Sequence, residues 1–388
     1  MKNLKYLAIG VICFVAVGIS GVCAAAYVDE ETMPEGNAWM GWYENTTVEE
    51  KEGVYYVTMG TDISTDLIIQ KGEEVVLDLN GHTLTNFTDD CEAIKVLAGG
   101  KLTIVNSSSE GGLVTQKESS KYSVITNQGT LIIESGNFET SLSKYIVRNE
   151  ADMTINGGTF TSTSTDTSMI GNIRTTDEDG VEIADNPVIP ELTINDGTFT
   201  AVSNAVINNA NSVVVINDGE FTSENTFALD NMATATINGG TFTSTNNNAI
   251  RINVRGTEVP ENLSLTITNG KFVSADDAES DIIYRLGDVT VPATTEVATV
   301  TGGTFSSDVS SFLGDSYEVD ENGTITEKEE VTTPPEEEKP TNPETPSEEI
   351  PELPQTYDGV VVSIVVGGIA LAVVATGIIL AKKKKLFN

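Results

Sequence analysis

The chain has 388 residues and a formal net charge of −37, from 58 acidic and 21 basic side chains. Because such a surface repels phosphates, the composition argues against a nucleic-acid partner. Aromatic residues make up only 6% of the chain and glycines number 34, which favours strands and turns over helices. The length fits one domain of about 250–300 residues with tails, or two domains.

Residues 1–26 have the pattern of a secretory signal peptide. Two lysines precede an apolar run at 7–22, which is followed by "CAAAY". The alanines form an A-x-A site, so we expect cleavage after Ala26. Acylation of Cys23 is a weaker alternative, because a valine precedes it where a small residue is expected. After cleavage Cys91 is the one cysteine left, so the sequence predicts no disulfide framework.

Residues 27–60 hold both tryptophans of the chain, Trp39 and Trp42, in "AWMGWYENT". The repeats that follow at 61–326 predict a solenoid, and a solenoid end exposes apolar core that needs a cap. We therefore interpret 27–60 as a cap region. A platform on which sugars stack is the alternative use of the two rings.

A short phrase recurs through 61–326. "TINGGTFTST" occupies 154–163 and returns letter for letter at 236–245. Looser copies share an apolar residue, a Gly-rich turn and a closing apolar residue, and the shortest spacings between them are 21 and 22 residues. A period of this length is typical of a solenoid. The closing residues are Leu84, Leu113, Phe138, Phe160, Phe199, Phe221, Phe242, Phe272 and Phe305.

Each unit contains three strand-like segments, as at 212–216, 220–223 and 226–230, and the first two alternate apolar with polar residues. Three short strands per unit, stacked in register, predict an all-β fold, a parallel β-helix of about nine coils and roughly 43 Å. The closing residues would stack inside the rod. One corner position would carry a ladder of hydrogen-bonded amides, from Asn156, Asn195, Asn217 and Asn238. Asparagine also follows the third strand, as at Asn127, Asn149, Asn209 and Asn231.

The opening "VVLDLNGHTLTN" at 75–86 and the "TINGGTF" phrases resemble the pectate-lyase-like superfold, in particular the β-helix regions of Gram-positive surface proteins. The resemblance implies a right-handed parallel β-helix. Many proteins of this superfold are polysaccharide lyases or hydrolases, so it also makes an enzyme the alternative to be weighed. Its lyases use a basic residue as the base, with acidic calcium ligands beside it.

Asp196 and Asp218 are the candidate carboxylate pair. They occupy the same position in adjacent units, which predicts a separation of about 5 Å, as suits the acid and nucleophile of a retaining glycosidase. Both stand in "NDG" corners, where aspartate serves turn geometry, and this favours a structural role. None of the five arginines shares their position, so a lyase base is missing from the pattern.

The sequence predicts no metal site and no cofactor. His82, the only histidine, falls at a corner on the first coil, and a metal or relay site would need partners. A calcium site in "DEDGVEIAD" at 177–185 stays open, although the spacing differs from that of an EF-hand loop. The inserts at 174–190 and 254–264 are the predicted partner-binding elements, because inserts in solenoids gather on one face.

Residues 327–352 are rich in proline and glutamate, cannot build a core and are predicted to form an extended spacer. Residues 353–388 then combine "LPQTYDG", an uncharged apolar run at 359–381 and four lysines. The apolar run is long enough to span a bilayer, and the lysines favour the cytoplasmic side.

This order resembles a sortase sorting signal of the LPxTG type, with Leu353, Pro354, Gln355 and Thr356 in the first four positions and Tyr357 where the family usually has glycine. The resemblance implies that a sortase cleaves after Thr356 and links its carbonyl to peptidoglycan. A plain single-span membrane anchor is the alternative. The sequence thus predicts a secreted, wall-anchored surface protein of a Gram-positive cell, with a non-catalytic role in display or adhesion toward a glycan or a host or matrix protein. The alternative function is a surface-anchored β-helix polysaccharide lyase or glycoside hydrolase.

Overall fold

The computed structural model describes residues 45–174, 188–256, 258–287, 289–290 and 297–328. The predictions on the signal peptide with Ala26, on the two tryptophans and on the sorting signal with its apolar run lie outside the described residues. Within those ranges, no helix is long and apolar enough to cross a membrane. The helical turn η2 (Ser310–Phe312) is a short 3-10 segment.

Almost all strands belong to three long sheets, here called A, B and C. Sheet A has the order β1 (Thr47–Lys51), β2 (Val54–Thr58), β5 (Glu74–Asp78), β8 (Lys101–Val105), β11 (Thr130–Ile133), β14 (Asp152–Ile155), β17 (Glu191–Ile194), β20 (Val213–Ile216), β23 (Thr234–Ile237), β26 (Ser264–Ile267) and β30 (Ala298–Val300). Sheet B has the order β3 (Ile63–Ser64), β6 (Thr83–Thr85), β9 (Leu113–Thr115), β12 (Asn137–Thr140), β15 (Thr159–Ser162), β18 (Thr198–Ala201), β21 (Glu220–Ser223), β24 (Thr241–Ser244), β27 (Lys271–Val273) and β31 (Thr304–Phe305). Sheet C has the order β4 (Leu67–Ile69), β7 (Ile94–Val96), β10 (Ile125–Asn127), β13 (Val147–Asn149), β16 (Ile170–Asn172), β19 (Val206–Asn208), β22 (Leu229–Asn231), β25 (Ile250–Val254), β28 (Ile282–Leu286) and β29 (Val289–Thr290).

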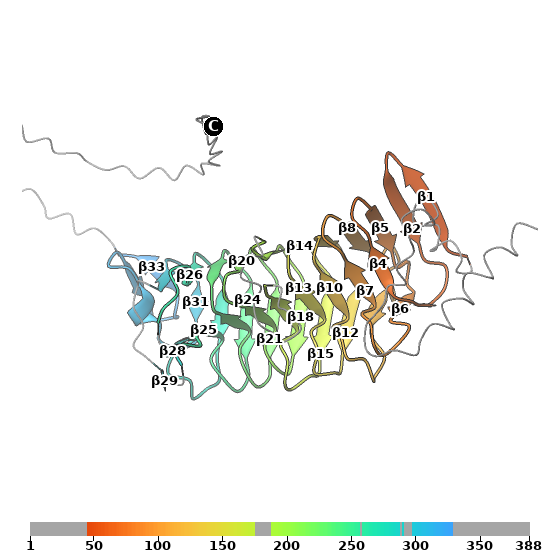
Figure 1. Cartoon of the computed structure of the whole chain (residues 1–388). Helices are drawn as coiled ribbons and strands as arrows, with labels where there is room; N and C mark the ends of the chain where they lie inside the picture. The colour runs from red at the N-terminus through yellow and green to blue at the C-terminus, as the bar shows by residue number, and fades with distance from the viewer. Residues whose placement is uncertain (1–44, 175–187, 257, 288, 291–296, 329–388) are drawn as a thin grey trace, which may run out of the picture. The chain divides into compact units, whose positions relative to one another are not determined.

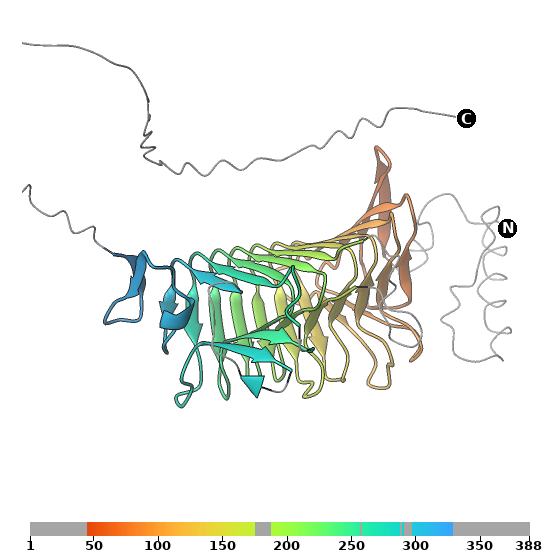
Figure 2. The same cartoon turned by 60° about the vertical axis from the view of Figure 1, so that its left-hand side comes forward.

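The chain visits the sheets in the fixed order A, B, C. Each strand in the body of the rod therefore pairs with the strands three places before and after it, and these pairings are parallel, as for β10 with β7 and β13. Figures 1 and 2 show the coils following one another along the rod from the red end to the blue end. The predicted all-β fold, with parallel sheets wound as a solenoid, is confirmed.

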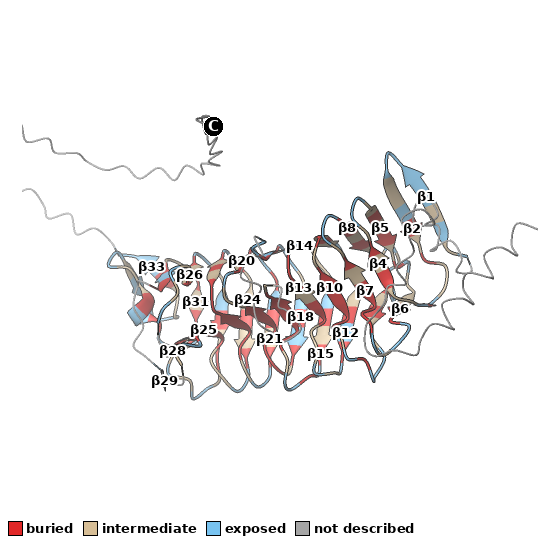
Figure 3. Cartoon of the chain, viewed as in Figure 1, coloured by how far each residue is buried: buried red, intermediate tan, exposed pale blue. Residues whose placement is uncertain are grey.

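The core follows from the alternation of side chains along each strand. In β20, for example, Val214 and Ile216 are buried and their neighbours are not. Figure 3 shows burial concentrated along the strands and exposure at the two end hairpins. The predicted aromatic column is confirmed: consecutive rings stack with centroids 4.5 to 5.1 Å apart, close to the spacing of parallel strands. Its members are Phe138, Phe160, Phe199, Phe221, Phe242, Phe272 and Phe305.

One prediction within this column is wrong. Val114, rather than Leu113, pairs with both Leu84 and Phe138 and is fully buried. The corner before β9 is longer than the Gly-rich corners elsewhere, so counting residues across it shifts the register by one. Because the side-chain period of a strand is two, that single step turns Leu113 away from the core.

The predicted ladder of corner amides is confirmed on the outside of the rod, between sheets A and B. The amide nitrogen of Asn195 donates to Asn156 at 2.7 Å, that of Asn217 to Asn195 at 2.7 Å, and that of Asn238 to Asn217 at 2.9 Å. These side chains are exposed or half-buried. Each amide donates to the preceding coil, and the chain of bonds runs toward the N-terminal end.

A second ladder lies inside the rod, at the end of the sheet C strands, and its amides donate in the opposite direction. The donor–acceptor distances are 2.7 to 2.9 Å, and every member is 0% exposed. Its members are Asn127, Asn149, Asn172, Asn208 and Asn231. The position predicted for Asn209 belongs to Asn208, because alternation from the buried Val206 points Asn208 inward.

Additional hairpins close the rod at both ends. At the start, β1 pairs antiparallel with β2, which already runs parallel to β5, so the parallel ladder begins within the predicted cap region. At the other end, η2 and the antiparallel hairpin of β32 (Tyr317–Val319) and β33 (Ile325–Glu327) follow the last coil. Phe312 and Ile325 are buried there and belong to the same core as Phe305. The aromatic column is thereby shielded from water.

Candidate binding face and pocket

The candidate carboxylates Asp196 and Asp218 lie at equivalent positions on adjacent coils, because Ile194 pairs with Ile216 two residues earlier. Both side chains are exposed. Each accepts a hydrogen bond from the backbone N–H of the glycine that follows it, at 2.7 and 2.8 Å. Those glycines have φ of 137° and 126°, which favours glycine. The two carboxylates therefore take part in the corner geometry that the sequence predicts for them.

His82 also lies at a corner. Its backbone N–H donates to Leu79 O at 2.8 Å, and its Nδ1 lies 3.5 Å from Asp62 Oδ1. The predicted calcium stretch at 177–185 lies outside the described residues. Among the residues that are described, no three histidine, cysteine or acidic side chains gather in a way that could hold a metal ion.

The inserts gather at one corner of the rod, as predicted. The first joins β16 to β17 and the second joins β25 to β26, so each leaves sheet C and returns to sheet A. The connection between β29 and β30, at 291–297, also leads from sheet C to sheet A. Both inserts therefore lie at the C-to-A corner, while the A-to-B corners from β11 onward keep their short Gly-rich turn. The B-to-C corner also carries a longer connection, at 274–281.

Sequence reasoning missed that all five arginines of this acidic chain belong to the same side. Arg148, Arg251 and Arg285 lie on strands of sheet C, and Arg174 and Arg255 follow such strands within two residues. Arg148 and Arg251 even share one outward-facing column, with Gly171, Ile207 and Asp230 between them. Inserts of unequal length separate these residues in the sequence, so a constant period could not find them.

Arg251 neutralises a carboxylate on this face. Its Nε lies 2.8 Å from Asp230 Oδ1 and its second nitrogen 2.5 Å from Oδ2, a two-point pairing on an aspartate that is 1% exposed. The guanidinium also lies 4.3 Å from the ring centre of Phe227. Because Asp230 and Phe227 already occupy its guanidinium, we assign Arg251 a role in the fold and not in ligand binding.

Tyr145 lies on the same face of sheet C, against Gly171. A Cβ on Gly171 would lie 2.8 Å from this ring, so glycine is what allows the ring to rest on the sheet. Burial raises the pKa of Tyr145, and the charges of Arg148 and Arg255 oppose that rise. Arg148 is bound to the buried Glu150 at 2.5 Å. The exposed Arg255 has no ion pair with any described residue.

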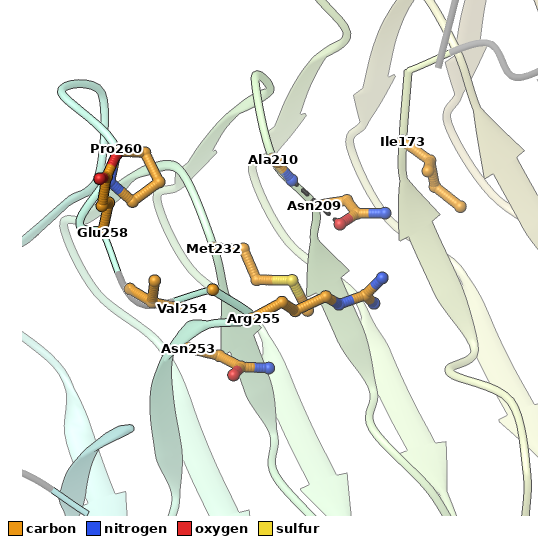
Figure 4. A pocket seen from close by; sticks show the side chains of 10 residues that line it. Ile173, Asn209, Ala210, Met232, Asn253, Val254, Arg255, Glu258 and Pro260 are labelled. Atoms are coloured by element: carbon orange, nitrogen blue, oxygen red, sulfur yellow. Dashed lines mark hydrogen bonds between the residues drawn. The ribbon is translucent and has the colours of Figure 1, made fainter. Parts of the chain in front are cut away.

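A cavity of about 320 Å³ opens at the same corner. Its floor crosses four coils and takes one residue from the outward side of each: Ile173, Asn209, Met232 and Asn253. The start of the second insert forms a wall, from Val254 to Pro260. Figure 4 shows the Arg255 side chain running along the pocket toward the strands that carry Asn209 and Ile173. A cation, a carboxylate, two amides and apolar side chains thus line one small pocket.

No family model, curated protein or solved structure matches the chain. The chemistry open to this corner therefore follows from its own residues. The described lining residues with a charge or an amide are Arg255, Glu258, Asn209 and Asn253. Of these, Arg255 and the two amides suit binding of an anion with an apolar part.

Proposed function

We propose that the chain is a non-catalytic surface protein of a Gram-positive cell, joined to peptidoglycan through Thr356, whose rod presents the C-to-A corner to a ligand outside the cell. In this proposal the rod is a right-handed parallel β-helix of nine full coils. The uninterrupted parallel pairing from β4 to β28 in sheet C supports that description.

The observation that carries the proposal is that regular and irregular features lie on different sides of the rod. Repeated residues, stacked rings and two amide ladders form a regular scaffold, and the repeats are specific for a fold rather than for a chemistry. The long inserts, the arginines and the pocket all depart from that regularity, and they lie on sheet C and at the C-to-A corner that follows it. In a solenoid, departures that collect on one side mark the face that meets a partner.

The anchoring part of the proposal is supported by the order of segments at the C-terminal end. The apolar run at 359–381 would hold the chain in the membrane with the four lysines inside, which leaves "LPQT" just outside. There a thiol enzyme attacks the Thr356 carbonyl and releases the tail that begins at Tyr357. Pro354 keeps its surroundings extended and therefore accessible. The 30 residues from 327 to 356 reach roughly 90 Å in polyproline-like form, so the rod stays near the wall.

Fractionation of cells that express Thr356→Ala tests this proposal. The wild type is expected in the peptidoglycan fraction without its lysine tail, and the variant in the detergent-soluble membrane fraction with that tail intact. Tyr357→Gly is the matched control, because it changes the neighbouring position to the residue usual in the family and should keep the wall attachment. A wild-type protein that extracts completely in detergent and retains Lys385 would show a plain membrane anchor instead.

A further inference from the structure

The pocket at the C-to-A corner has the composition of a site for one negative charge beside an apolar group. We propose that it binds the C-terminal end of a peptide, with the terminal carboxylate on Arg255 and the last side chain on the apolar floor. This inference rests on the proposed function only in that the corner faces outward, and it names the ligand class for that face.

Arg255 supplies the charge. It is exposed and has no ion pair with any described residue, although the chain carries 58 acidic side chains. Figure 4 shows this side chain running along the pocket, beside the strands that carry Asn209 and Ile173. A guanidinium without an ion pair can bind a carboxylate through two parallel hydrogen bonds.

Two amides extend the polar side of the pocket. The Oδ1 of Asn209 already accepts from the backbone N–H of Ala210 at 3.0 Å, which leaves its Nδ2 directed away from that bond. Asn253 lies two coils further along the same floor and makes no side-chain hydrogen bond to a described residue. Neutral amides can both donate to a carboxylate and accept from a peptide N–H, which an arginine alone cannot do.

The rest of the lining is apolar. Ile173, Met232 and Val254 present side chains that are nearly buried, and Pro260 closes the wall. Close by in the chain, Val259 is 46% exposed, and Ile189 at the end of the first insert is 53% exposed. Both inserts thus carry exposed apolar side chains, as is common where a protein segment docks. The volume of about 320 Å³ limits the enclosed part to the last one or two residues.

Charge distinguishes this ligand from a polyanion. Glu258 also lines the pocket, and the chain as a whole carries −37. A polymer of uronic acids would bring many negative charges against that field, whereas a peptide end brings one. Capture of a terminal carboxylate by a few fixed donors is an established mode of peptide recognition.

Calorimetric titration of the full-length chain in detergent with acetyl-alanyl-leucine tests the proposal. The free acid should bind, and the same peptide with a C-terminal amide should bind about tenfold more weakly or not at all. Arg255→Gln should lose about tenfold as well, with an unchanged melting temperature because the side chain is exposed. Lys271→Gln is the matched control: it removes the same charge from an exposed residue on sheet B and should leave the affinity unchanged.

Equal affinity for the acid and the amide would overturn the proposal, and so would an equal loss in the Arg255→Gln and Lys271→Gln variants, which would indicate bulk charge alone. Glucuronic acid is titrated in parallel, and tighter binding of this sugar than of the peptide would overturn the peptide class. The measurement needs no wall attachment. Failure of binding therefore leaves the Thr356 experiment intact, and failure of sorting leaves the titration intact.

Discussion

Replacing Asn172 with alanine tests how much the buried ladder contributes to the stability of the rod. Asn172 is in the middle of the ladder and is 0% exposed. It accepts from Asn149 at 2.8 Å, and its Nδ2 donates to Asn208 at 2.9 Å and to the backbone carbonyl of Val213 at 2.8 Å. The substitution removes three well-formed hydrogen bonds from a place that water does not reach.

The expected loss in unfolding free energy follows from these bonds. A buried hydrogen bond contributes about 1 kcal/mol net, and a polar group left without a partner costs about 1–3 kcal/mol. In the variant, Asn149 still donates to the backbone carbonyls of Ala151 and Glu191, and Asn208 still accepts from Ser212 Oγ. The cost of groups left without a partner is therefore near the low end of its range. We expect about 3–5 kcal/mol.

The outer ladder provides the control. Asn195 also stands between two asparagines, with distances of 2.7 Å on both sides, but its side chain is exposed. Water can replace both bonds, so Asn195→Ala should change the stability by less than about 0.5 kcal/mol. Urea unfolding followed by circular dichroism compares the two variants. Equal shifts of the midpoint would refute the reasoning, because they would show that burial does not decide what an amide ladder contributes.

Three further predictions follow from the fold. Phe221→Ala should lose about 3–5 kcal/mol of unfolding free energy, because it removes a buried ring from the middle of the stack; an unchanged melting temperature would contradict that. The backbone N–H of Thr324 is the main cause that lowers the pKa of Asp320 below 3.8. The charged carboxylate should therefore stabilise the C-terminal hairpin above pH 3.8, and this stabilisation should be lost as the pH falls further. Proton resonances of the hairpin amides in an acid titration would report that loss. Purified protein should not degrade polysaccharides, and degradation that Asp218→Asn abolishes would favour the enzymatic alternative.

Local repetition made the scaffold predictable from the sequence. A phenylalanine at a constant offset from a Gly-rich corner indicates a column, because equal coils place equal residues above one another. The predicted register was wrong where a corner changes length, as before Val114, and where two asparagines are adjacent, as at 208 and 209. In both cases the alternation along the strand decides which side chain points inward, and the spacing of the phrase does not report it.

The pocket could not be predicted from the sequence for a different reason. Ile173 and Asn209 are neighbours on the pocket floor, yet the first insert separates them in the sequence, so no constant period links the two. The floor of the pocket takes a single residue from each of four coils, and none of the four has a distinctive sequence context. Only the register of sheet C places Ile173, Asn209, Met232 and Asn253 side by side.

The identical phrases at 154–163 and 236–245 have a consequence for how such a chain can change in length. Recombination between the two copies would delete the 82 residues 155–236 (236 − 155 + 1) and leave one intact phrase. Ile237 would then take the place of Ile155, and the strands on either side would still meet in register, because both copies occupy the same position in sheet A. The rod would lose three coils, about 14 Å, without a misplaced side chain at the junction. The same event would remove Ile173, Asn209 and Met232 from the pocket floor. A single deletion would therefore change both the length of the rod and the lining of the pocket. We expect length variants of this kind to differ in what they bind.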